Sequence, residues 1–241
     1  MVKYIVLYFL LRKCKASLMF KGFTKKTSDF LWELSFNNER PWFLEHKEEF
    51  EEVLNRPFRE LAKETFELFC LRNPELDCRL HIARIYRDAR RLHGRGPYKD
   101  HLWFSIKKTV ALLEGPTFWF EIGAADYSYG MGFYSATAEQ MGRFRRLVDA
   151  NPAAFERLAE DVMSHGEFKI FGEEYKRPRG NYEGIIGQWY NRKQLGLECT
   201  RDFGGDVLSP ELPEILVDSF EKLMPMYEFF LKFYFEEENI Q

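Results

Sequence analysis

Apolar residues recur at helical spacing along the first third of the chain, which is typical of amphipathic helices. The spacing within Phe30–Leu34 predicts a helix that begins at the N-cap residue types Thr27–Asp29. A second helix is predicted after Asn37 and Asn38, either of which can cap it. The same spacing resumes beyond Pro57, so further helix is predicted there.

Shorter apolar runs rich in β-branched and aromatic residues follow, and they predict strands. These runs are 79–86, 103–106, 117–125, 129–135 and 197–201, with 168–175 as a strand or hairpin. Gly130 and Gly132 within one run indicate a bulge or the close approach of another backbone. Because the connections are too short for helical crossovers, the sheet is predicted to be mainly antiparallel.

Helical spacing returns over 138–150 and 152–164, with a helical turn near 189–194 and a long closing helix after Ser209. Pro225 lies inside the closing helix and is expected to kink or divide it. Helices, then strands, then helices predict an α+β fold. We expect N-terminal helices packed on a mainly antiparallel sheet, with a closing C-terminal helix, in a single domain over 19–241.

Residues 1–18 differ in character from the rest of the chain. The apolar run Val2–Leu11 has about half the length of a membrane span, and basic residues follow it. We interpret 1–18 as a non-native or disordered leader, with a short strand or a weak secretion signal as alternatives. The cysteines form no Cys-x-x-Cys pair, which predicts reduced thiols in a cytoplasmic protein. They are Cys14, Cys70, Cys78 and Cys199.

The overall composition excludes some classes of protein. The 241 residues include 35 Lys and Arg against 38 Asp and Glu, a formal net charge of −3. Nucleic acid is therefore a disfavoured partner, because phosphate neutralisation needs a basic surplus. A hydrophobic fraction of 45% excludes general disorder. No apolar run is long enough to predict a membrane partner.

Against this balance, the segment Arg84–Lys99 is strongly basic and holds one acid, Asp88. Its cationic residues are Arg84, Arg87, Arg90, Arg91, Arg95 and Lys99. An arginine at the end of an apolar strand is partly desolvated and requires a carboxylate, a phosphate or several carbonyl groups as partner. In one interpretation Arg84 and Arg87 pair with Asp88 or with acids such as Glu121 and Asp126.

In the other interpretation the basic side chains bind an anionic small molecule that carries phosphate or carboxylate. The candidate ligand-binding residues are Arg84, Arg87, Arg90, Tyr98 and Lys99, with Asn38 and Arg40 at the edge. Asp88 is the candidate acid or base if the protein is an enzyme acting on such a molecule. The alternative function is a non-enzymatic protein-interaction or scaffold module with a purely structural arginine cluster.

Common catalytic and cofactor motifs are missing from the sequence. His81, His93 and His101 match no zinc-binding spacing, so no metal is predicted. Gly94–Gly96 lacks the third glycine and the strand-to-helix setting of a dinucleotide site, so no cofactor is predicted. Asp202–Gly204 imitates a kinase triplet without its companion motifs.

Several motifs occur in a characteristic order. They are Phe20-x-Gly22-Phe23, Asn37-Asn38-x-Arg40-x-Trp42-Phe43, Arg84-Ile85-Tyr86-Arg87-Asp88-x-Arg90, Pro97-Tyr98-Lys99, Gly130-x-Gly132-x-Tyr134 and Pro178-Arg179-Gly180. In this order they resemble the domain of unknown function 2461 family over roughly Met19 to Arg201. The resemblance implies a soluble bacterial or fungal protein and supplies no catalytic residues. The family's aromatic residue after the third arginine is absent here. We expect the Asn37–Phe43 and Arg84–Lys99 segments to meet between helix and sheet.

Overall fold

The computed structural model describes residues 19–92, 94–109, 115–133 and 135–235. The leader expected over 1–18 lies outside these residues, as do Cys14 and His93. The chain divides into two compact units. The first unit comprises the chain up to Ile106 together with Phe120–Ser128 and Thr200–Val217. The second comprises Lys107–Trp119, Tyr129–Cys199 and the chain from Asp218 onward.

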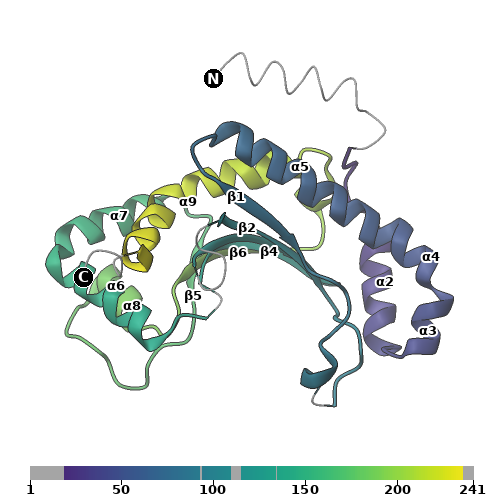
Figure 1. The fold of residues 1–241 in the computed structure, drawn as a ribbon, viewed down its shortest axis with the longest axis horizontal. Coiled ribbons are helices and arrows are strands. Elements are labelled where there is room, and N and C mark those ends of the chain that lie inside the picture. Colours follow the sequence, from purple (N-terminus) through teal and green to yellow (C-terminus); the bar gives the residue numbers. More distant parts are fainter. Residues whose placement is uncertain (1–18, 93, 110–114, 134, 236–241) are drawn as a thin grey trace. The chain divides into compact units, whose positions relative to one another are not determined.

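The first unit begins with helices, as the apolar spacing predicts (Figure 1). They are α2 (Lys25–Phe36), α3 (Arg40–Glu45), α4 (Lys47–Phe50), the π-helical turn η1 (Glu51–Asn55) and α5 (Arg56–Arg72). The N-cap of α2 is Thr24, and that of α3 is Glu39, so the caps expected at Thr27–Asp29 and at Asn37 or Asn38 are wrong. Thr27 is instead buried, where its hydroxyl donates to the Val53 carbonyl oxygen (2.7 Å).

Six strands form one antiparallel sheet in the order β1-β2-β3-β4-β6-β5. They are β1 (Cys78–Ile82), β2 (Leu102–Lys108), β3 (Thr117–Ile122), β4 (Asp126–Gly132), β5 (Lys169–Phe171) and β6 (Gly196–Asp202). The first four strands are neighbours in chain order, which short connections permit only between antiparallel strands. The predicted α+β fold class is therefore confirmed.

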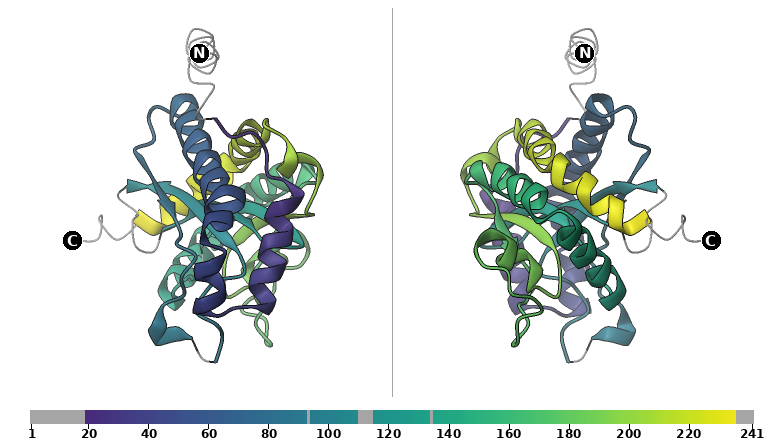
Figure 2. Two further views of the ribbon diagram at one scale, coloured as in Figure 1. Left: turned by 90° about the vertical axis from the view of Figure 1, so that its right-hand side faces the viewer. Right: turned by 90° about the vertical axis from the view of Figure 1, so that its left-hand side faces the viewer.

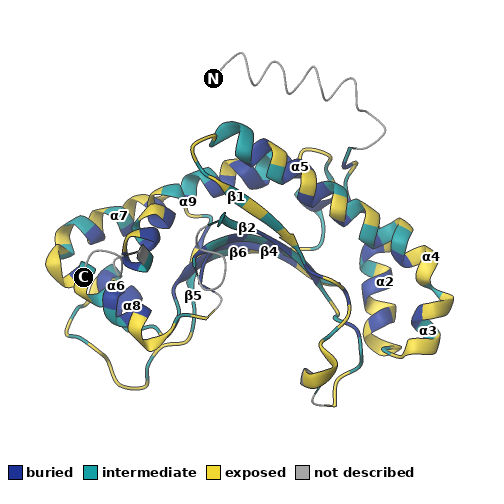
Figure 3. Cartoon of the chain, viewed as in Figure 1, coloured by how far each residue is buried: buried dark blue, intermediate teal, exposed yellow. Residues whose placement is uncertain are grey.

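The helices of the first unit cover its part of the sheet through aromatic side chains. Phe58 of α5 lies 5.8 Å from Phe104 of β2 and 6.3 Å from Phe120 of β3, measured between ring centroids. All three rings are fully buried. The outer sides of α3 and α4 remain exposed, which places their glutamates in solvent (Figure 3). Burial of large flat side chains on one face thus attaches the N-terminal helices to the strands.

The second unit has its own helices, α6 (Ala138–Ala150), α7 (Pro152–Ser164) and α8 (Gly184–Tyr190). Helix α7 contacts both α6 and α8 (Figure 2). The closing helix α9 (Leu212–Phe235) continues through Pro225, so the expected division of this helix is wrong. Within the second unit α9 packs against β3, where Tyr227 and Phe118 have ring centroids 4.5 Å apart. Buried contacts of this kind offset the hydrogen bond that the proline removes.

Candidate functional site

The basic segment Arg84–Lys99 folds as a hairpin that extends β1 and leads into β2, within the first unit. Tyr86 and Tyr98 form an isolated antiparallel bridge. The Arg87 N–H donates to the Pro97 carbonyl oxygen (2.8 Å), and the Lys99 N–H donates to the Ile85 carbonyl oxygen (2.7 Å). This pairing brings residues from the two ends of the segment next to each other.

Asn38 joins the helices to this hairpin. Its amide Nδ2 donates to the Tyr98 carbonyl oxygen, and its Oδ1 accepts from the Tyr98 N–H, both at 2.9 Å. The side-chain amide therefore makes the two hydrogen bonds that a neighbouring strand would make. Phe43 stacks on the Tyr98 ring at a centroid distance of 4.0 Å. The expectation that these two segments meet is confirmed.

Arg87 is a largely buried element of the hairpin, with 15% of its side chain exposed. Its Nε donates to the Tyr98 carbonyl oxygen (2.7 Å), and its Nη2 pairs with Asp100 Oδ1 (3.1 Å). The sequence predicts Asp88, Glu121 or Asp126 as the acid partner of Arg87, whereas the partner in the structure is Asp100. Desolvation explains the pairing, because a half-buried guanidinium requires acceptors on several N–H groups.

Lys99 and Arg84 lie beside Arg87. The Lys99 Nζ donates to the Arg84 carbonyl oxygen (2.5 Å). Burial lowers the pKa of the Lys99 ammonium, and the positive charges of Arg87 and Arg84 lower it further, with Glu121 acting in the opposite direction. Arg84 itself is exposed, and its guanidinium forms no ion pair within the described part of the chain. The three side chains thus form a basic cluster (Arg84, Arg87 and Lys99).

Asp100 and His101, which are not among the predicted site residues, border the basic cluster. Asp100 Oδ1 contacts both Arg87 Nη2 (3.1 Å) and His101 Nδ1 (2.9 Å), and His101 Nε2 lies 3.9 Å from Glu121 Oε2. Burial raises the pKa of the Asp100 carboxyl, but hydrogen bonds and the nearby positive charges hold it below the usual value. Asp100 and His101 directly follow the Pro97-Tyr98-Lys99 motif, and this position is the sequence signal that identifies them as neighbours of the site.

Arg90 and Asp88 form a separate local pair. The Asp88 carboxylate accepts from Arg90 Nε (3.0 Å), Nη2 (2.8 Å) and the Arg90 N–H (3.0 Å). The last contact caps the short 3₁₀ turn η2 (Ala89–Arg91). The Arg90 side chain is 87% exposed, and no contact joins it to the basic cluster in the described residues. These contacts assign Asp88 a capping role in the turn.

Arg40 is the first residue of α3 and follows Asn38 by two positions in the sequence. Burial raises the pKa of the Tyr98 phenol, Tyr86 raises it further, and the positive charge of Arg40 opposes both. Arg40 is therefore close enough to act on this phenol electrostatically. It is exposed and forms no ion pair within the described ranges.

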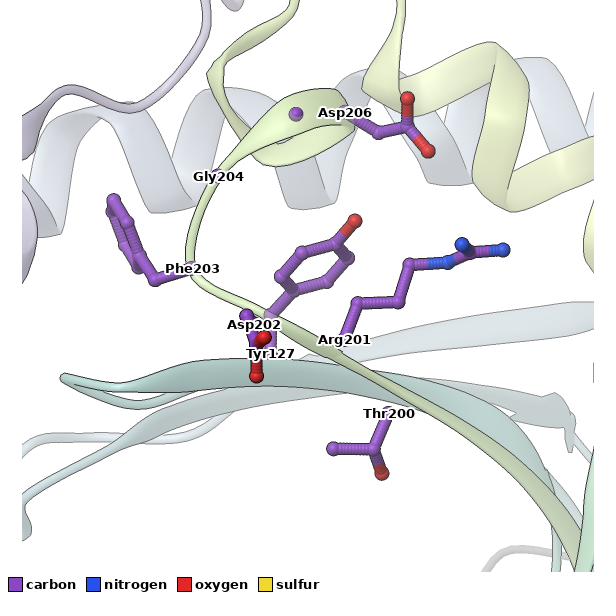
Figure 4. A pocket seen from close by; sticks show the side chains of 8 residues that line it. Tyr127, Thr200, Arg201, Asp202, Phe203, Gly204 and Asp206 are labelled. Carbon is purple, nitrogen blue, oxygen red and sulfur yellow. The ribbon is translucent and has the colours of Figure 1, made fainter.

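A concave region of the first unit lies around the turn that follows β6. Tyr127 and the residues from Thr200 to Asp206 surround a cavity of about 610 Å³. Figure 4 shows the side chains of Tyr127 and Arg201 on one side of the sheet, and that of Thr200 on the other. The Asp202–Gly204 triplet, which lacks the companion motifs of a kinase, lines part of this cavity. The lining supplies charges of both signs and no histidine or cysteine.

Two negative findings apply to the described residues. No group of three or more His, Cys, Asp or Glu side chains there could hold a metal ion. None of the helices described here combines the length and the apolar character needed to cross a membrane.

Comparison with known protein families gives a match over most of the chain. A family model described as a conserved hypothetical protein (DUF2461) matches residues 26–229. No curated protein matches the chain. The matched range includes the Asn38 contact, the basic cluster and the turn after β6.

Proposed function

This chain belongs to the conserved hypothetical protein family DUF2461, and we propose that it binds an anionic small molecule at the basic cluster. The family description states no activity, so the proposal is based on the site. The ligand class is a molecule that carries phosphate or carboxylate groups. Arg84 and Lys99 contact the anion, whereas Arg87 adds positive charge from its place in the hairpin. Asn38 and Tyr98 hold the backbone that carries them.

One observation carries the proposal: three cationic side chains are held together with too little negative charge around them. Asp100 pairs with Arg87 and His101, and Glu121 acts on both Lys99 and His101. The Arg84 guanidinium has no acid partner in the described part of the chain. Like charges held close together are unfavourable, and a bound anion would relieve this repulsion.

The rival function, a protein-interaction module with structural arginines, is favoured by a different observation. Arg87 is largely buried and already bonded to Tyr98 and Asp100. This residue therefore serves the fold under either function. Variants of Arg84 and Lys99 distinguish the two functions, because the rival function gives these residues no ligand to bind.

The test measures the thermal unfolding midpoint of the full chain in sodium sulfate, phosphate or citrate, with sodium chloride at equal ionic strength as reference. A specific ligand stabilises the native state in proportion to RT ln(1 + [L]/Kd). We expect at least one oxyanion to raise the midpoint above its value in chloride. Arg84→Gln and Lys99→Met should abolish this rise.

Each variant should fold without ligand, since Lys99→Met also removes a charge that its neighbours destabilise. Arg59→Gln, on the exposed side of α5, is the matched control and should respond as the parent does. An equal response of the parent, both site variants and the control would overturn the proposal. A parent that responds no more to oxyanions than to chloride would do the same.

We also propose a cytoplasmic location. Among the described residues, Cys70 and Cys199 are free thiols. Free thiols are typical of a reducing compartment.

A further inference from the structure

The second unit contains a basic loop (residues 172–183) between β5 and α8 that is held in place along its length. The Tyr175 N–H donates to the Asn191 carbonyl oxygen (2.8 Å), and the Arg179 N–H donates to Asn191 Oδ1 (2.7 Å). Glu174 and Arg192 form an isolated antiparallel bridge. One residue, Asn191, thus fixes the backbone on both sides of Pro178.

The C-terminal part of the loop is fixed by tyrosines. Asp149 of α6 accepts hydrogen bonds from the hydroxyl groups of Tyr182 and Tyr190, each at 3.0 Å. Gly180 lies so close to the Tyr190 ring that a Cβ at this position would be 2.6 Å from Cε1. Only glycine fits this contact without displacement of the ring or the loop.

Stacked arginine and tyrosine side chains support the centre of the loop. Arg145 donates to the Tyr190 carbonyl oxygen (3.0 Å), and its guanidinium carbon lies 5.4 Å from the Tyr175 ring centroid. The guanidinium carbon of Arg179 lies 4.3 Å from the same centroid. These distances are within cation–π range. The stack positions Arg179 at the surface with its edge N–H groups unbonded in the described residues.

Three of the acids around the loop already have partners. Glu173 pairs with Lys193 (2.7 Å), Glu174 pairs with Arg192 (3.2 Å), and Asp149 accepts from the two tyrosines. Exposed cations remain without an acid partner in the described ranges: Lys176, Arg177 and Arg179. Glu183, at the N-cap of α8, is the nearest acid in the sequence that forms no ion pair within the described residues. The loop therefore presents three positive charges within four residues.

We propose that Lys176, Arg177 and Arg179 form a docking site for an acidic peptide segment of a partner protein. Arginine presents a planar fork that binds carboxylates through two hydrogen bonds, which suits Asp and Glu side chains. Because the loop is fixed before binding, little conformational entropy is lost when the partner docks. This proposal does not depend on the anion site of the first unit.

The local charge favours a short acidic peptide over a nucleic acid. Glu173, Glu174 and Glu183 flank the three cations, and the whole chain carries a net charge of −3. A long phosphate chain would pass these carboxylates, and their repulsion would oppose it. A short peptide can contact the cations alone.

The experiment measures fluorescence anisotropy of a short fluorescein-labelled peptide of alternating Glu and Ser, titrated with the full chain at low salt. We expect saturable binding that weakens as salt is raised. The double variant Arg177→Gln/Arg179→Gln should bind roughly tenfold more weakly or worse, since hydrogen bonds to charged groups are lost. Arg177→Gln alone should show part of this loss without a change in folding, because Arg177 forms no hydrogen bond or ion pair within the described residues.

The matched control is Arg157→Gln/Lys232→Gln, which removes the same charge from exposed positions on α7 and α9 of this unit. It should bind the peptide as the parent does, and both the control and Arg177→Gln should keep the parent's unfolding midpoint. Equal weakening in the control and loop variants would overturn the proposal, as would absence of binding by the parent. A labelled oligothymidylate of matched charge that binds more tightly than the peptide would also overturn it.

Discussion

At the scale of single residues, Asn38 replaces a strand neighbour with one side chain. Both of its hydrogen bonds go to the Tyr98 backbone, and Gly96 lies so close that a Cβ there would be 2.3 Å from the Asn38 side chain. Asparagine is common near helix starts for reasons of local capping, which is the role that the sequence predicts. The observed role depends on a residue sixty positions away, so local pattern could not show it.

Replacement of Asn38 tests this contact. In Asn38→Ala the Tyr98 N–H has no partner in the structure, so the free energy of unfolding should fall by about 1–3 kcal/mol. Asn37→Ala is the control, because the Asn37 side chain is exposed and, within the described part of the chain, bonds only to the Glu33 carbonyl oxygen. It should lose about 0.5 kcal/mol or less. Urea denaturation of both variants checks the difference, and equal losses would contradict this role of Asn38.

At the scale of elements, the sequence defines the helices better than the strands. The predicted bounds 138–150 and 152–164 agree with α6 and α7, because the capping residues Thr137 and Asn151 act locally. The strand predicted over 129–135 is instead β4 (Asp126–Gly132). Strand bounds depend on the partner strand, and the partner of β4 on one side, β6, lies far away in the sequence.

The glycines of β4 do follow from their pattern. A Cβ on Gly130 would lie 2.0 Å from the Leu197 carbonyl oxygen of β6, so the expected close approach of a backbone is confirmed. Gly130→Ala should therefore lower the free energy of unfolding by about 1–3 kcal/mol or more.

Gly142 in α6 is the matched control for this substitution. A Cβ there would meet only the Arg146 side chain, at 3.6 Å. Gly142→Ala should raise the free energy of unfolding by about 0.5–1 kcal/mol, because alanine loses less backbone entropy in a helix. Chemical denaturation of both variants measures the two signs, and a stabilising Gly130→Ala would contradict the close packing of β4 and β6.

At the scale of the whole molecule, the change in stability at acidic pH depends on carboxylates whose pKa values are shifted in opposite directions. Burial raises the pKa of Glu167, but hydrogen bonds from Lys222, Tyr129 and Ser219 and the charge of Lys222 hold it below the usual value. Burial raises the pKa of Glu198, and Lys169 offsets this only in part. Glu167 thus contributes stability above its unfolded-state pKa, which is lost as the pH falls through its folded-state pKa. Glu198, whose pKa is raised, lowers the stability at neutral pH, and this loss disappears as the pH falls and the carboxylate is protonated.

Two glutamine variants test these signs. Glu167→Gln should be less stable than the parent at neutral pH, and the difference should shrink as the pH falls below about 5. Glu198→Gln should be more stable than the parent at neutral pH, because it removes a charge that burial disfavours, and the gain should vanish in acid. Urea unfolding across this pH range checks both. A Glu167→Gln difference independent of pH would contradict the assignment.

The sequence by itself determined the class of the fold, the helices with local caps, the close approach at Gly130 and the existence of a locally basic segment. Each follows from periodicity, turn chemistry or charge within a short window of the chain. The tertiary structure decided which groups meet. It paired Arg87 with Asp100, placed Asn38 on the Tyr98 backbone and kept Pro225 inside a continuous helix. Contacts between residues distant in the chain depend on the packing of whole elements, which no local pattern encodes.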